Sequence, residues 1–344
     1  MSNVKVSIII LNAFSTYDLE SCLNSLNMIE YANYEIIVVD YKTPKISALI
    51  KNNYPKVRLI TLVGNDIGPS AMHNVGIASS DSQSRYVAFL DNDTVVEKKW
   101  LSELVNVMES DERIAAVQSK ILLYDNPHFL NTCGNKSNFL AVGWPDGYAT
   151  PDHFDCSVKE ISFPSGAATL FRKKIINKIG RFDESYFIYA DDLDVGLRTL
   201  LAGYKILYCP TSIVYHKYRF LRSKRGFYFL NRNRLRTFLK LYDARTYLLM
   251  IPPFCLYEFY VFSYAILNRL TREIINCYWN NLIDLKTILI GRRNAQQIKS
   301  ISDRALIKKL EGKINFIEIS NIPAVVALLN PFLQKYRKLL INNL

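Results

Sequence analysis

Residues 85–97, RYVAFLDNDTVVE, limit the possible folds more than any other part of this 344-residue chain. The apolar run at residues 86–90 is rich in strand-forming residues and predicts a strand buried on both faces of a parallel sheet. This run ends abruptly at Asp91, Asn92 and Asp93. Open α/β sheets bind ligands at the carboxyl ends of their strands, and carboxylate oxygens are preferred ligands of Mg2+. The stretch therefore predicts a site for a divalent metal and a diphosphate.

The same three residues allow a second interpretation. Asp and Asn are favoured in turns, so residues 91–93 also fit an exposed turn that leads into a helix starting at Thr94. The tripeptide alone leaves both interpretations open, and the choice between them depends on the rest of the chain.

Strands and helices alternate in the residues before this stretch. The predicted strands cover residues 4–11, 35–40 and 57–62, and the predicted helices cover residues 16–26 and 46–53. Right-handed crossovers between parallel strands place helices on both faces of the sheet and gather the carboxyl strand ends at one edge. The sequence therefore predicts an α/β fold with a Rossmann-like, mostly parallel sheet.

Polar residues follow the ends of the predicted strands. They are Asn12, Asp40, Asp66 and Asp91, with Asn92 and Asp93 beside the last. An exposed cap or turn explains any one of them, but several on one rim favour a shared binding site.

A Gly-Pro turn and a helix containing Asn74 follow the third strand, in residues 65–78. The amino end and backbone amides of such a helix suit a nucleotide or its diphosphate. The chain has no G-x-G-x-x-G after a strand and no Walker-type lysine loop, so dinucleotide binding and P-loop chemistry are disfavoured.

Two more carboxylates begin a predicted amphipathic helix. Asp191 and Asp192 occupy its first turn, where the helix dipole favours ionised side chains, so a carboxylate there can act as a general base. The alternative is that both are only good helix-start residues.

Two ring side chains are further candidates. His216 ends a predicted strand at residues 212–215, and an imidazole near the 91–93 carboxylates would complete a metal site; a structural histidine is the alternative. Trp144 lies in residues 125–159, which lack a sustained period and predict loops and short strands over the site. There it either stacks on a sugar or packs as an ordinary aromatic.

Five segments, in order and spacing, resemble glycosyltransferase family 2 in its rhamnosyltransferase-like branch. They are SIIILN at 7–12, VVD at 38–40, FLDND at 89–93, SGAATLFRK at 165–173, and GRFDESYFIYADDLDVGLR at 180–198 through to YCPTSIVYH at 208–216. The resemblance covers about residues 4–240. It implies a GT-A domain at 1–240, followed at 241–344 by a helical extension for a membrane interface or for oligomerisation.

The resemblance also implies roles for the candidate residues. Asp40 contacts the nucleobase, and Asp192 is the catalytic base beside Asp191, which stands where the family usually has Glu. The resemblance gives Asp91, Asp93 and His216 as the ligands of Mg2+ or Mn2+. Together with the residues selected above by position, the expected donor-binding set is Asn12, Asp40, Asp66, Asn74, Asp91, Asn92, Asp93 and Trp144. The implied reaction is inverting transfer of a hexosyl or deoxyhexosyl group from a UDP-, dTDP- or GDP-sugar. The acceptor is a hydroxyl of a glycan or of a lipid-linked molecule.

Charge is unevenly distributed along the chain. Residues 1–216 carry 20 basic and 24 acidic side chains, whereas residues 217–344 carry 23 basic and 7 acidic ones. The basic C-terminal third implies an anionic partner. Ten basic residues interleaved with aromatics at 217–245 leave a nucleic-acid-binding module as a rival function, although the acidic site upstream would repel a phosphodiester backbone.

Residues 246–267 hold one charge, Glu258, and are long enough to span a membrane. Pro252, Pro253 and that charge favour a helix lying at the interface or packed on the domain. Six scattered cysteines fit a reducing cytosol, so we expect a cytoplasmic protein, peripheral on the inner face of the cell membrane, with a single span as the alternative. A homo-oligomer stays open.

A nucleotidyltransferase that makes the sugar nucleotide is a further alternative, because it would share the sheet. It should carry a Gly-rich phosphate loop after the first strand, where this chain has Asn12-Ala13-Phe14-Ser15.

Overall fold

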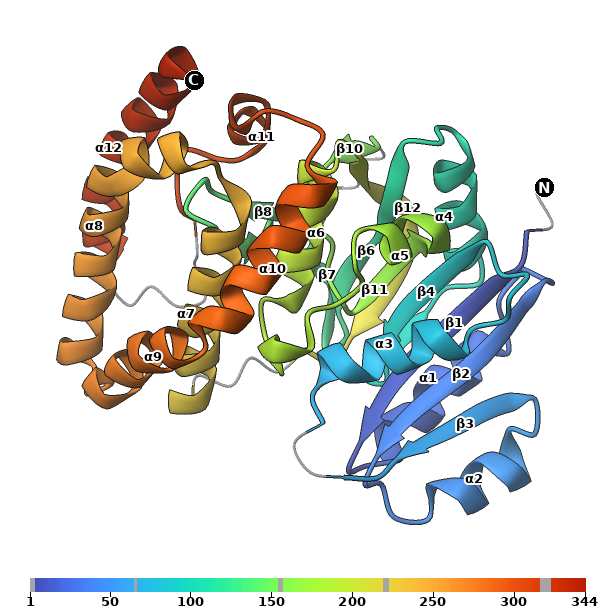
Figure 1. The fold of residues 1–344 in the computed structure, drawn as a ribbon. Coiled ribbons are helices and arrows are strands. Elements are labelled where there is room, and N and C mark those ends of the chain that lie inside the picture. Colours follow the sequence, from blue (N-terminus) through green and yellow to red (C-terminus); the bar gives the residue numbers. More distant parts are fainter. Residues whose placement is uncertain (1–3, 65–66, 154–156, 219–222, 316–322) are drawn as a thin grey trace.

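The computed structural model describes residues 4–64, 67–153, 157–218, 223–315 and 323–344 (Figure 1). Asp66, one of the predicted donor-binding residues, lies outside the described residues.

The strands and helices follow one another in an α/β pattern, and within the described residues the named elements after residue 223 are helices. The strands are β1 (Val6–Ala13), β2 (Tyr34–Tyr41), β3 (Val57–Leu62), β4 (Tyr86–Asp91), β5 (Thr94–Val96), β6 (Ile114–Leu123), β7 (Asn126–Thr132), β8 (Asn135–Ser137), β9 (Gly143–Pro145), β10 (Lys159–Glu160), β11 (Ala168–Arg172) and β12 (Lys205–His216). The helices are α1 (Tyr17–Leu26), α2 (Ile46–Asn53), α3 (Pro69–Ser79), α4 (Trp100–Glu109), α5 (Lys173–Lys178), the 3-10 helix η1 (Glu184–Tyr186), α6 (Asp191–Leu201), α7 (Lys224–Leu241), α8 (Ala244–Leu267), α9 (Thr271–Ile283), α10 (Leu285–Ile298), α11 (Asp303–Lys309) and α12 (Pro323–Asn343).

One mixed sheet forms the centre of the molecule. Its strand order is β10-β12-β6-β11-β4-β1-β2-β3, with β5 paired to β12 and β7 paired to β6. Strands β4, β1, β2 and β3 are mutually parallel, while β11 runs antiparallel to both β4 and β6. The predicted α/β fold with a mostly parallel sheet is therefore confirmed.

The two faces of the sheet pack into two separate cores because side chains alternate along each strand. In β1, Ile8 and Ile10 pack with α1, α2 and α4, whereas Ile9 joins a core on the opposite face with α3 and α6. Strand β4 is buried along its apolar run on both faces, as expected for a central strand.

Strand β5 decides between the two interpretations of the stretch after β4. Thr94 begins this short strand rather than a helix, so the helix-start alternative is wrong. Because β5 pairs antiparallel with β12, with His216 opposite Thr94, it brings the end of β12 beside residues 91–93.

The C-terminal helices share the core of the α3 face. Met250, Tyr257, Val261 and Ala265 of α8, and Leu340 of α12, belong to the same buried cluster as Ile9. Figure 1 shows α7 to α12 gathered to one side of the sheet. The predicted boundary at residue 240 stays a prediction, but this shared core means that truncation near it would expose apolar surface.

The structure of helix α7 argues against reading the basic stretch at 217–245 as a surface that binds nucleic acid. Arg232, Arg234, Arg236 and Lys240 are buried, with 9%, 5%, 1% and 2% of their surface exposed. Their partners are internal: Arg234 pairs with Glu258, Arg236 with Asp284, Lys240 with Asp183 and Asp194, and Arg232 donates to the Ser185 carbonyl. These four side chains are buried and bonded inside the protein, so they are not available to bind a nucleic acid.

Helix α8 is long and apolar enough to cross a membrane, by length and composition, and 28% of its most apolar window is buried. It runs as one helix through Pro252 and Pro253. Its inner face packs in the core, while Leu248, Phe259 and Leu267 are exposed.

Candidate active site

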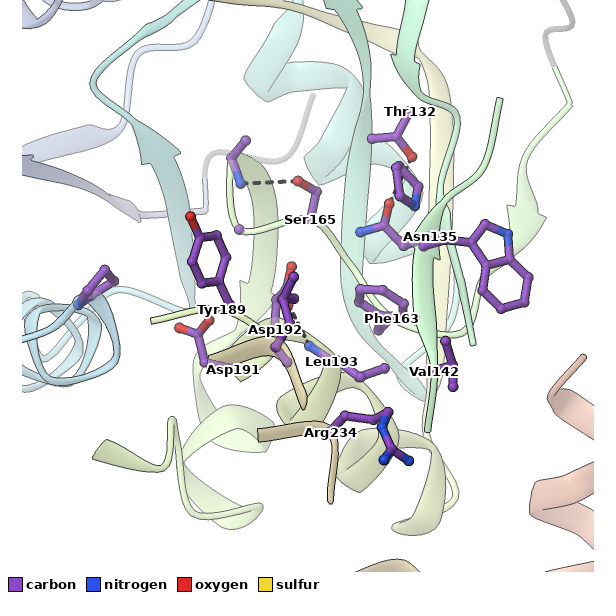
Figure 2. A pocket seen from close by; sticks show the side chains of 18 of the residues that line it. Thr132, Asn135, Val142, Phe163, Ser165, Tyr189, Asp191, Asp192, Leu193 and Arg234 are labelled. Atoms are coloured by element: carbon purple, nitrogen blue, oxygen red, sulfur yellow. Dashed lines mark hydrogen bonds between the residues drawn. The ribbon is translucent and has the colours of Figure 1, made fainter. Parts of the chain in front are cut away.

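A cavity of about 600 Å3 opens where the carboxyl ends of β1 and β4 meet α6, the end of β12 and the helices α7 and α8. Its volume is in the range of sites for nucleotide-sized ligands. Figure 2 shows part of its lining, with Asp191 and Asp192 among the side chains of Ser165, Phe163, Tyr189 and Arg234. Its lining combines polar side chains, such as Asp91 and Asn131, with side chains of α8, such as Tyr257, Tyr260 and Val261.

Asp91, Asp93 and His216 form a cluster, and Asp91 and His216 line the cavity. One ligand atom from each lies within 4.8 Å of the others. Asp91 ends β4, Asp93 follows in the turn to β5, and His216 ends β12, so the pairing of β5 with β12 assembles the group. The His216 Nε2 atom lies 3.2 Å from the Asp93 Oδ1 atom.

Asn131 fixes the orientation of the His216 ring. Its Oδ1 atom lies 3.0 Å from His216 Nδ1, which therefore acts as the donor and leaves Nε2 facing the carboxylates. This is the arrangement in which an outer residue sets the tautomer of a metal-binding histidine. No sequence signal pointed to Asn131, which lies in β7.

Burial and the charges of neighbouring residues shift the pKa values of Asp91 and His216. Burial, with the nearby negative charge of Asp93, raises the pKa of Asp91 to about 6. Burial lowers the pKa of His216, but its hydrogen bond to Asp93 and the charges of Asp93 and Asp91 outweigh burial and raise it overall. The raised pKa values show that the clustered negative charge attracts cations, protons included. Two carboxylates and an imidazole form a nitrogen and oxygen donor set that fits Mg2+ or Mn2+.

Asp191 and Asp192 open α6 and line the same cavity. Burial, with the charge of Asp191, raises the pKa of Asp192 to about 7. Burial also raises the pKa of Asp191, whose Oδ2 atom accepts a hydrogen bond of 3.2 Å from the Ser70 hydroxyl. A carboxylate with a pKa near 7 is suited to accept a proton at neutral pH.

Asn12 links three strand ends on the rim. Its Nδ2 atom donates to Asp40 Oδ1 at 2.8 Å and to Thr43 Oγ1 at 3.0 Å, and its Oδ1 atom accepts from Asn92 Nδ2 at 2.6 Å. Asp40 is fully buried and also accepts from the Thr43 amide at 3.2 Å. Asn12 and Asn92 line the cavity. Asp40 accepts from Asn12 and is not among the lining residues, and its contact with a nucleobase stays a prediction.

Of the predicted donor-binding residues Asn74 and Trp144, only Trp144 lines the cavity. Asn74 holds the segment before α6: its Nδ2 atom donates to the Phe182 carbonyl and to Glu184, and its Oδ1 atom accepts from the Phe182 amide. Trp144, in β9, is 3% exposed and lines the cavity, and its Nε1 atom has no hydrogen-bond partner within the described residues. Donor contacts by either residue stay predictions.

With this geometry in place, the class of protein follows from comparison. The chain belongs to the family described as glycosyltransferase like family 2, whose model matches residues 3–238. Among curated relatives, the O-antigen chain rhamnosyltransferase WbaN of Salmonella anatum is 25% identical over 194 residues, covering 54% of this chain and 57% of the relative. The N-acetylglucosaminyl-diphospho-decaprenol L-rhamnosyltransferase of Mycobacterium tuberculosis is 33% identical over 73 residues, covering 21% of this chain and 24% of the relative.

Solved structures share the fold. The structure of GalNAc-T7 with UDP, GalNAc and Mn2+ superposes with a TM-score of 0.58 at 16% identity, covering 70% of this chain and 48% of that one. The mannosyltransferase PcManGT from Pyrobaculum calidifontis, in complex with GDP-Man and Mn2+, gives a TM-score of 0.50 at 13% identity and covers 98% of this chain and 84% of that one. These likenesses confirm the GT-A fold.

Proposed function

We propose that this protein is an inverting glycosyltransferase that moves a hexosyl or deoxyhexosyl group from a nucleotide-diphosphate sugar to a hydroxyl of a lipid-linked or polysaccharide acceptor. The observation that carries the proposal is one cavity lined both by Asp192, with its pKa raised to about 7, and by Asp91 and His216, which form a cluster with Asp93. The first group is suited to remove a proton and the second to receive a charged diphosphate through a cation.

The chemistry needs one displacement. Asp192 takes the proton of the acceptor hydroxyl as that oxygen attacks the anomeric carbon from the face opposite the leaving group. The bond from the anomeric carbon to the diphosphate oxygen breaks, and the electron pair leaves with the nucleoside diphosphate. Asp91, Asp93 and His216 would hold Mg2+ or Mn2+, which when bound neutralises charge on the diphosphate.

Membership of the glycosyltransferase family and the missing phosphate loop after β1 both weigh against the nucleotidyltransferase alternative. Burial of four α7 cations, Arg232, Arg234, Arg236 and Lys240, weighs against the nucleic-acid module. Two relatives, named as rhamnosyltransferases, support transfer of a deoxyhexose, and one of those names includes a diphospho-decaprenol acceptor.

The test is a donor screen with the full chain. UDP-, dTDP- and GDP-sugars are supplied with Mn2+ or Mg2+, and release of the nucleoside diphosphate is measured with and without lipid-linked and soluble glycan acceptors. We expect one donor class to be consumed at a rate that rises when an acceptor is added. Release with none of the donors under any of these conditions would contradict the proposal.

The exposed apolar side chains of the C-terminal helices support a peripheral position on a membrane. They gather on α8, α9 and the start of α10, which are consecutive along the chain, and include Phe259, Leu267, Trp279, Leu282 and Leu289. Exposed Arg269, Arg272, Lys286 and Arg293 lie on the same segments. Exposed apolar and basic side chains together are typical of helices that lie in the interface of an anionic bilayer, and we propose that this segment lies on the inner face of the cell membrane.

We expect the full chain to float with anionic liposomes, and about 0.5 M salt to weaken but not abolish this binding, because apolar insertion is not screened by ions. A triple variant, Phe259→Ser with Trp279→Ser and Leu282→Ser, should lose flotation while keeping its unfolding temperature, because the three side chains are 60–70% exposed and support little of the core. Liposome flotation measures the binding, and a thermal melt measures the stability.

The matched control replaces exposed apolar residues elsewhere, Met28→Ser with Val158→Ser, which should float as the parent does. Equal flotation of the triple variant and the control would contradict the membrane assignment. Steeply salt-dependent binding of RNA or DNA, with no flotation, would favour the nucleic-acid alternative instead.

A further inference from the structure

The turn that precedes α6 has an unusual backbone. Phe187, Tyr189 and Ala190 have φ values of 63°, 65° and 57°, in the left-handed region that residues with a Cβ rarely adopt. Three such residues within four positions lie directly before Asp191 and Asp192. Strain of this kind persists only where surrounding contacts hold it, and it concentrates at functional sites.

The side chain of Asn233, on α7, makes those contacts. Its Nδ2 atom lies 2.9 Å from the Tyr186 carbonyl oxygen, 2.9 Å from that of Ile188 and 2.8 Å from that of Tyr189. Asn233 is completely buried. One amide group therefore contacts three carbonyls of a single turn. Asn233 lies 43 residues further along the chain than Ala190, the last residue of that turn with a positive φ.

Chemistry fixes the orientation of this amide. If the Asn233 group were rotated by half a turn, its oxygen would face three carbonyl oxygens, which repel it, so the NH2 group must point at the turn. The Oδ1 atom is buried and has no partner within the described residues. A buried acceptor without a hydrogen bond costs free energy, so retaining it implies that the donor contacts are worth more than this cost.

Residues at the start of helix α3 also contact this turn and the residue that opens α6. A Cβ atom at Gly68 would lie 2.3 Å from the Phe187 carbonyl oxygen, so only glycine permits this approach. Ser70 then donates to Asp191, the second residue after Tyr189. The turn is therefore held between α3 and α7, and α6 begins where those contacts end.

We infer that Asn233 is a positioning residue, which sets the direction in which Asp191 and Asp192 enter the cavity by fixing the left-handed turn before them. The inference rests on the proposed function, in which Asp192 is the base. Asn233 touches neither reactant; it acts through the backbone of residues 186–190. Loss of its amide should therefore impair the proton-transfer step more than the binding of donor.

The test compares Asn233→Ala with the parent in the full chain. We expect kcat to fall by about 10²-fold, because a displacement of about 1 Å at a reacting group has an effect of that size. Affinity for the nucleoside diphosphate with Mn2+, measured by calorimetry, should stay within about twofold, because the amide donates to carbonyls of residues 186–189 and not to the metal cluster. If this variant is recovered unfolded, Asn233→Ser, which buries no charge and can donate only one hydrogen bond, is measured in its place.

Gln296→Ala is the matched control. The Gln296 Nε2 atom also donates to two backbone carbonyls, those of Lys240 and Leu241, both at 2.9 Å, but at the far end of α7. It should lose a comparable amount of thermal stability and keep its kcat. Equal loss of kcat in both variants would mean that Asn233 only stabilises the fold, and would overturn the inference.

A second-site change tests the left-handed turn directly. Glycine adopts positive φ without a steric penalty, so Ala190→Gly added to Asn233→Ala should recover part of the lost kcat. No recovery, or a kcat of Asn233→Ala within about twofold of the parent, would overturn the role assigned to the amide. Failure of the function itself is distinguished by Asp192→Asn: if that variant retains full turnover, the base lies elsewhere, whatever Asn233 does.

Discussion

Asp192→Asn is expected to lower turnover by about 10²–10⁴-fold, the contribution typical of a positioned general base. The amide matches the carboxylate in shape, so the donor should still bind with unchanged affinity, but it cannot accept the proton of the acceptor hydroxyl. Steady-state transfer assays give the turnover, and calorimetry with the nucleoside diphosphate and Mn2+ gives the binding.

The raised pKa of Asp192 adds two consequences. Because the base must be ionised, kcat/KM of the parent should fall as pH is lowered through about 7. The folded state also holds this proton more tightly than the unfolded chain does, so stability is lost as pH rises from the unfolded pKa near 4 to the folded pKa near 7. Above pH 7 the ionised carboxylate destabilises the fold, so Asp192→Asn should raise the unfolding temperature at pH 8 by about 2 °C or more.

Asp191→Asn is the comparison variant. The Asp191 carboxylate is already engaged by Ser70, so we expect a smaller loss of turnover than for its neighbour. Full turnover in Asp192→Asn together with loss in Asp191→Asn would assign the base to Asp191. If Asp192→Asn raises the unfolding temperature without losing turnover, the raised pKa of Asp192 is supported but its role as the catalytic base is rejected.

The strand ends could be predicted from the sequence because local composition determines them. Apolar, β-branched runs such as those at 6–11 and 86–90 form strands wherever both faces are buried, and a polar residue ends each run at the same edge. Asn12, Asn92 and Asp91 therefore lie on one cavity, as the rim of predicted strand ends implied. The helix beginning at Asp191 followed in the same way from its apolar spacing.

Other parts of the site depend on contacts between residues far apart in the chain. Asn131 meets His216 only because β7 and β12 both pair with β6, and no local pattern shows this. The cations of α7 look like a surface stretch in sequence, but Glu258 and Asp284, which neutralise two of them, lie 24 and 48 residues away. Asn233 is one polar residue in that stretch, and its role becomes visible only with the turn that it binds.

Loss of the metal site is the second change with a large expected effect. Asp93→Ala should lower transfer by about 10³-fold or more, because a bound cation contributes several kcal/mol of charge stabilisation and each 1.36 kcal/mol is a factor of ten in rate. EDTA should abolish transfer by the parent, and added Mn2+ should restore it. Asp81→Asn, which changes a carboxylate paired with Lys5 at the surface, is the control and should transfer as the parent does.

Direct Mn2+ binding separates the metal from other roles of these residues. Asp93→Ala should bind Mn2+ much more weakly, and Asn131→Ala, which frees the His216 ring, should weaken binding by about 10–100-fold, the usual effect of removing an outer partner. Affinity in the parent should rise with pH above 6.5, because Asp93 raises the pKa of His216 and a protonated ring cannot bind a cation. Undiminished transfer in EDTA would reject a metal-dependent mechanism. Undiminished Mn2+ affinity in Asp93→Ala would place the cation outside the cluster of Asp91, Asp93 and His216, even if transfer requires it.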